Sequence, residues 1–101
     1  MSNEGGQGAR IKLSIRATDK KGIRTSGFAY NGITVRMSGG KGSFEAEPNV
    51  TRLLEWAMVG DPGGSMKVEV LREGAAIYTR EKSEIVQPYS KAVDAFEIKV
   101  S

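Results

Sequence analysis

The dipeptide Asn31-Gly32 constrains the fold more than any other local feature, because it lies between two runs of alternating apolar and polar residues. Asn and Gly tolerate the positive φ angles of a type I′ turn, whose twist matches that of the strands it joins. A two-residue loop also sets the register, which places Tyr30 opposite Ile33. The apolar side chains of this hairpin then share one face: Phe28, Tyr30, Ile33, Val35 and Met37.

Alternation with a period of two recurs along most of the chain and predicts further strands. It is strictest in residues 10–17, where Ile11, Leu13 and Ile15 alternate with basic and polar side chains. Shorter alternating runs occupy residues 43–47, 66–71, 75–79 and 92–100. One apolar and one polar face on nearly every strand indicate antiparallel pairing with one side open to water.

Residues 50–59 depart from this alternation and predict one helix. The apolar residues around this segment recur at the spacing of a single helical stripe: Val50, Leu53, Leu54, Ala57 and Met58. Asn49 is a suitable N-cap and Gly60 a suitable C-cap, while Pro62 prevents the helix from continuing. Trp56 then lies at the rim of the stripe.

The expected fold class is α+β, a mainly antiparallel sheet of six to seven short strands with the helix at about residues 50–59 packed against it. A chain of 101 residues corresponds to one domain. Residues 1–9 contain three glycines and no apolar cluster, so we expect a flexible arm before a domain at residues 10–101. The sequence has neither a secretory signal nor the roughly 20-residue apolar run of a membrane-spanning helix, which predicts a cytoplasmic protein without membrane contact.

The sequence contains no cysteine and no histidine, and this absence removes several classes of chemistry. It excludes disulfides, thiolate and imidazole ligands for zinc, a thiol nucleophile and a histidine general base. The glycine-rich segment 38–43 contains a lysine but lacks the spacing of a phosphate-binding loop. Glu45 and Glu47 share one solvated strand face and form no acid–base pair. We therefore expect no enzyme activity, no catalytic residue, no metal and no cofactor.

Basic residues are concentrated early in the chain, with eight basic and two acidic side chains in residues 1–42 against seven and ten in residues 43–101. Basic surfaces of this kind are typical of proteins that bind phosphates. The candidate residues for nucleic-acid or other polyanion binding are Arg10, Lys12, Arg16, Lys20, Lys21, Arg24, Arg36 and Lys41. This hypothesis requires them to converge on one surface, without acids such as Glu69 and Glu97 between them.

Protein contact is the function that we expect first, because small sheet domains without catalytic equipment generally act through their surfaces. The partner is another protein or a second copy of this chain, which would make a homo-oligomer. Edge strands invite pairing, and the first and last strands are the expected edges. Aromatic side chains often anchor interfaces, and the candidates are Trp56, Tyr78 and Tyr89. Polyanion binding is the alternative, and a pocket of roughly 300 Å³ or more for a small apolar ligand is a third hypothesis.

Overall fold

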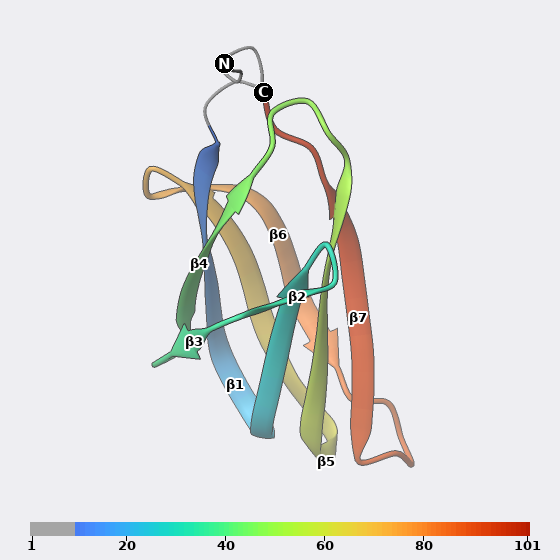
Figure 1. Ribbon diagram of the computed structural model, residues 1–101. Helices are drawn as coiled ribbons and strands as arrows, with labels where there is room; N and C mark the ends of the chain where they lie inside the picture. Colours follow the sequence, from blue (N-terminus) through green and yellow to red (C-terminus); the bar gives the residue numbers. More distant parts are fainter. Residues whose placement is uncertain (1–9) are drawn as a thin grey trace, which may run out of the picture.

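The computed structural model describes residues 10–101, and these residues form seven antiparallel strands and no helix (Figure 1). The flexible arm expected at residues 1–9 lies outside the described residues. Two strands, β1 (Ile11–Tyr30) and β5 (Arg52–Arg72), are far longer than the rest and pair with each other along most of their length. The shorter strands are β2 (Ile33–Val35), β3 (Met37–Ser38), β4 (Lys41–Ala46), β6 (Ala75–Glu84) and β7 (Lys91–Ile98).

Strands β1 and β5 both bend near their midpoints, and the bend folds one continuous sheet into two facing layers (Figure 1). The back sheet contains β4, the first half of β1, the second half of β5, and β6. The front sheet contains β2, the second half of β1, the first half of β5, and β7. A single hydrophobic cluster draws buried side chains from both layers, so the core lies between them.

The bend is built from residues that let a paired strand change direction. The β1–β5 register shifts between Thr18 and Thr25, and within this stretch Gly22 has a φ of 72°. On β5, Gly63 has a φ of 87°. A Cβ atom on Gly60 would collide with the carbonyl oxygen of Gly22, so glycine is required where the two backbones approach each other.

The helix expected at residues 50–59 is wrong, and with it the α+β fold class, because this segment lies mostly in the first half of β5. The apolar residues of this segment fit both the helical period and the strand period. A helix would bury Leu53 together with Leu54, whereas the strand buries Leu54, Trp56 and Met58 and exposes the residues between them. Pairing with β1 on one side and β7 on the other decides in favour of the strand, since tertiary context overrides a local preference.

The register expected for the Asn31-Gly32 hairpin is confirmed, because Tyr30 pairs with Ile33. A second turn of the same kind, Glu73-Gly74, joins β5 to β6, and all four turn residues have positive φ angles. In each half of the chain, a long strand forms a hairpin through its second half and pairs with a later strand through its first half. The two halves therefore share one topology.

Leu53 and Leu54 test the strand at β5, because the same truncation has different consequences in a strand and in a helix. Leu54 is 0% exposed, whereas Leu53 is 42% exposed. We expect Leu54→Ala to lower the free energy of unfolding by about 2 to 5 kcal/mol and Leu53→Ala to lower it by about 0.5 kcal/mol or less. Urea denaturation at low protein concentration, followed by Trp56 fluorescence, measures both values. Equal losses would contradict the alternation.

Candidate functional site

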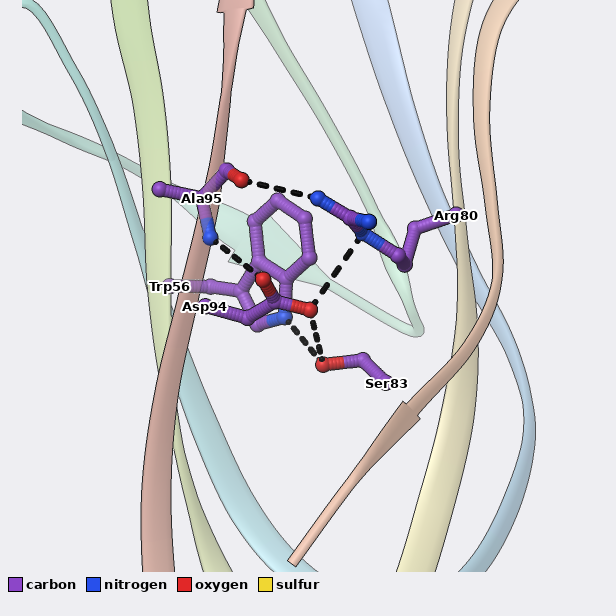
Figure 2. Close-up of polar contacts among 5 residues, drawn as sticks. All are labelled: Trp56, Arg80, Ser83, Asp94 and Ala95. Atoms are coloured by element: carbon purple, nitrogen blue, oxygen red, sulfur yellow. Dashed lines mark hydrogen bonds and ion pairs between the residues drawn. The ribbon is translucent and has the colours of Figure 1, made fainter.

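A chain of polar contacts ties the front sheet to the back sheet on the side where β6 and β7 lie (Figure 2). The indole Nε1 of Trp56 donates a hydrogen bond to Ser83 Oγ at 2.9 Å. Ser83 Oγ in turn donates to Asp94 Oδ2 at 2.9 Å. The guanidinium of Arg80 flanks the same carboxylate, with its Nε 3.4 Å from Oδ2. We call these four residues the polar seam.

Side chains of the polar seam and its neighbour Tyr78 also cover the free edge of β7. Arg80 Nη2 donates to the carbonyl oxygen of Ala95 at 2.9 Å. The Tyr78 hydroxyl donates to the carbonyl oxygen of Lys99 at 2.8 Å and accepts from the amide of the same residue at 2.9 Å. Ala95 lies within β7 and Lys99 just beyond its end, so these contacts occupy part of the edge that another strand would otherwise pair with.

The polar seam is structural in character. Ser83 is 1% exposed, and its hydroxyl proton is directed at Asp94. A serine nucleophile needs a general base and room for a substrate, and the buried position of Ser83 leaves no such room. The hydroxyl instead satisfies a buried indole donor and a partly buried carboxylate at the same time. The polar seam therefore joins the two sheets and has no room for a substrate at Ser83.

The three aromatic residues expected at an interface lie in different environments. Tyr89 is 65% exposed, in the segment between β6 and β7. Tyr78 is half-buried, with its hydroxyl bound to Lys99. Trp56 is 2% exposed, and its ring packs edge-on against Phe96 with centroids 5.2 Å apart. Trp56 is thus a core residue rather than a rim or contact residue.

The strands expected at the sheet edges also differ from expectation. The first strand, β1, is an interior strand, paired with β5 on one side and with β4 and β2 on the other. The last strand, β7, is an edge, but side chains of β6 cover part of it. The edge of β7 is thus partly occupied, whereas β2 and β6 each pair with a strand on one side only among the described residues.

The outer surface of the front sheet, in contrast, is exposed and largely apolar. Its members alternate with the core residues of the same strands; we call them the front face: Thr25, Gly27, Ala29, Leu53, Glu55, Ala57, Val59, Lys91, Val93, Ala95 and Glu97. Val93 is 81% exposed at the centre of the β7 segment. Ala57 pairs with Val93 on one side and Gly27 on the other, so a row of small apolar residues crosses three strands.

The structure divides the eight basic candidates between several surfaces. Four of them border one hollow of about 490 Å³ on the outer side of the back sheet: Lys12, Arg16, Arg36 and Lys41. The other four border further hollows: Arg10 shares one with Arg36 and another with Lys12; Lys20 and Arg24 share a third; and Lys21 borders a fourth. Nothing in the sequence pattern marked Arg36, from the segment between β2 and β3, as a neighbour of Lys12. Only the return of the chain through β3 and β4 brings them together.

Glu69 interleaves with the basic residues of β1. Arg16 Nε lies 3.0 Å from Glu69 Oε1, and Lys67 Nζ lies 4.0 Å from Oε2. The hydrogen bond from Arg16 holds the pKa of Glu69 below its ordinary value, with the charges of Arg16 and Lys67 acting in the same direction. Glu97 lies on β7 in the other sheet. A stripe of all eight basic residues is therefore not formed, whereas a cluster of four is.

A smaller hollow of about 290 Å³ lies between β2 and β4. On its wall, the rings of Tyr30 and Phe44 stack with centroids 4.4 Å apart. Burial raises the pKa of Tyr30, whose hydroxyl has no hydrogen-bond partner among residues 10–101. Four charged side chains border the hollow: Arg10, Arg36, Glu45 and Glu47. This rim does not offer the predominantly apolar lining that the small-apolar-ligand hypothesis requires.

Comparison of the chain with protein-family models, curated proteins and solved structures gave no match. Within residues 10–101, no group of three or more acidic side chains is placed to hold a metal ion. The same residues include no helix long and apolar enough to cross a membrane. The function has to be argued from the surfaces described above.

The polar seam predicts a specific energetic coupling between Ser83 and Trp56. Ser83→Ala leaves the buried indole N–H without an acceptor, so we expect a loss of about 1 to 3 kcal/mol in the free energy of unfolding. In the background of Trp56→Phe, which removes the donor, the same change should cost at least about 0.5 kcal/mol less. Ser90→Ala, at an exposed serine, is the control. Additive losses in a denaturation-based double-mutant cycle would rule out the coupling.

The Arg16–Glu69 pair predicts a pH dependence with a defined sign. Because the folded-state pKa of Glu69 is lowered, its contribution to stability is complete above the unfolded pKa of about 4.3. That contribution is lost as the pH falls through the folded-state pKa. Glu69→Gln should therefore be less stable than the parent chain at neutral pH, and the difference should shrink in acid. Urea midpoints measured across this range, with the exposed Glu73→Gln as control, test the sign.

Proposed function

We propose that this chain is a binding module that acts through protein contacts made by its front face, with a second copy of the chain as the partner. The observation that carries the proposal is the exposed apolar centre of that face, where Val93 is 81% exposed beside Ala57. Contiguous apolar patches on small proteins commonly mark interaction sites. Sheet faces of this kind pack against each other at a separation of about 10 Å.

The charges of the front face are arranged for a second copy. Lys91 and Glu97 lie at opposite ends of the β7 segment, about 20 Å apart at the usual rise per strand residue. A two-fold axis that crosses the strands between Val93 and Ala95 would place Lys91 of one copy over Glu97 of the other. The same patch then serves both copies, as an isologous interface requires.

The register supports the same arrangement on the other strands. On β5, the axis places Val59 over Leu53 of the second copy, and on β1 it places Gly27 over Ala29. Apolar side chains therefore meet apolar side chains in most rows. Glu55 is the one charged residue inside the face, and it meets the small Ala57, which leaves room for its side chain.

The size of the face sets the strength of the expected contact. Three strands about 4.8 Å apart and an eight-residue segment give a flat projection of about 400 Å². This is about half of the roughly 800 Å² per partner of a standard interface, so the self-association is expected to be weak and dependent on concentration. The cytoplasm remains the proposed location, on the sequence argument alone.

Sedimentation equilibrium tests the proposal on the full chain. We expect the weight-average mass to rise above the chain mass of 10.9 kDa as the concentration increases from about 1 µM to about 1 mM. Val93→Glu should abolish the rise, because it removes the apolar centre of the interface and adds a second carboxylate to the face that already holds Glu55. Val86→Glu makes the same change at a valine that is 64% exposed outside the front face, and it should leave the rise intact.

A charge exchange tests the orientation of the two copies. Lys91→Glu should weaken association because it faces Glu97 of the second copy, and adding Glu97→Lys in the same chain should restore it. Failure of the double variant to restore association would exclude the proposed axis. A parent chain that stays at the mass of one copy across the whole concentration range would contradict self-association itself.

A further inference from the structure

The basic hollow on the outer side of the back sheet is separate from the front face and has its own chemistry. Its floor includes Ser14 on β1 and Ser43 on β4, which are directly opposite each other in the register. The four basic residues around it are Lys12, Arg16, Arg36 and Lys41. No acidic residue is among those that border it. Hydroxyl donors are thus surrounded by cations, a combination suited to phosphate oxygens.

Three of these four cations have no acidic partner in the fold. Within residues 10–101, Lys12, Arg36 and Lys41 make no ion pair, whereas Arg16 is paired with Glu69. Lys12 is opposite Glu45 in the register, but the two form no ion pair. Among the described residues, three cations without an ion pair therefore border this one hollow, and no acidic residue borders it.

The pairing of β1 with β4 adds an independent observation. Arg16 and Lys41 are directly opposite each other in the register, and like charges at opposed positions destabilise a sheet. Glu69 compensates Arg16 from the β5 side, but nothing among the described residues compensates Lys41. An anion bound over the two strands would relieve this repulsion, so the fold gains from an occupant of negative charge.

The residues around the hollow also indicate which kind of anion fits. Its apolar members are Ile15 and Leu71, and no aromatic side chain borders it. Surfaces that bind single-stranded nucleic acids stack bases on aromatic rings, and this surface has none. The volume of about 490 Å³ is within the range of small-molecule sites, about 300 to 1,000 Å³. Lys41 is opposite Arg16 in the register, four residues along β1 from Lys12, so the two lysines lie about 13 Å apart along the strands. This distance exceeds the reach of a single phosphate.

We propose that the basic hollow binds a small molecule with two or more linked phosphate groups, held by Lys12, Arg36 and Lys41 and by the hydroxyls of Ser14 and Ser43. This site does not depend on self-association through the front face. Arg16, which is held by Glu69, sets one boundary of the site rather than supplying a free charge. The four cations come from β1, the β2–β3 segment and β4, so the site exists only in the folded chain.

Isothermal titration calorimetry with sodium tripolyphosphate tests the proposal on the full chain, at about 0.05 M and about 0.2 M salt. We expect saturable binding at one site per chain that weakens with salt. Lys41→Gln should weaken it about tenfold or more, since a charge-assisted hydrogen bond is lost. Lys21→Gln removes the same charge from the same half of the sequence but outside the hollow, so it should change the affinity by less than about twofold. Absence of saturable binding, or equal loss in both variants, would overturn the proposal.

Two further measurements distinguish this proposal from nucleic-acid binding and from self-association through the front face. A single-stranded thymidine oligonucleotide of the same total charge should bind more weakly than tripolyphosphate, and tighter binding would overturn the choice of a small ligand in favour of nucleic acid. Lys41→Gln should leave self-association unchanged, and Val93→Glu should leave tripolyphosphate binding unchanged. Each proposal can therefore fail without the other, and a nuclear magnetic resonance spectrum of each variant establishes that it is folded.

Discussion

The continuous pairing of β1 with β5 is the constraint on which the rest of the structure depends. The two strands remain paired on both sides of a bend, so one ribbon supplies the two central strands of both sheets (Figure 1). Each layer is then completed by one strand from each half of the chain, and each half follows the same path. The bend tolerates no Cβ at Gly60, because the backbone of the partner strand passes too close.

Folding one ribbon into two layers creates a hydrophobic core between the layers and leaves strand edges with unpaired backbone groups at their sides. The core is filled from inward positions of both long strands, with Trp56 packed between aromatic neighbours. The edge of β7 is covered by Arg80 and Tyr78 from β6, and the polar seam holds the layers together at that side (Figure 2). The two outer faces of the sandwich differ in chemistry. One is apolar around Val93, and the other is basic around Lys41.

The segment around Trp56 shows where sequence reasoning reached its limit. Leu53, Leu54 and Met58 satisfy a helical period, and Leu54, Trp56 and Met58 satisfy a strand period within the same ten residues. Local pattern cannot choose between them, because the choice depends on whether neighbouring strands supply backbone partners. The prediction that the first strand is an edge is wrong for the same reason, since β1 has partners on both sides that lie far along the chain, whereas the last strand, β7, is an edge as expected. The local pattern does not reveal the front face either, because Leu53 and Ala57, which point outward from β5, also fit the helical stripe.

Features that depend on neighbours along the chain can be read from the amino-acid sequence. These are the Asn31-Gly32 turn with its register, the alternation that buries Leu13 and Ile15, and the concentration of basic residues before position 43. Long-range strand pairing makes residues 52–72 one bent strand and places Val93 beside Ala57. It also brings Arg36 and Lys12 to one hollow, while Lys20 borders another. The physical reason is that turn geometry and burial period are local properties, whereas sheet partners are chosen by backbone hydrogen bonds between segments far apart in the sequence.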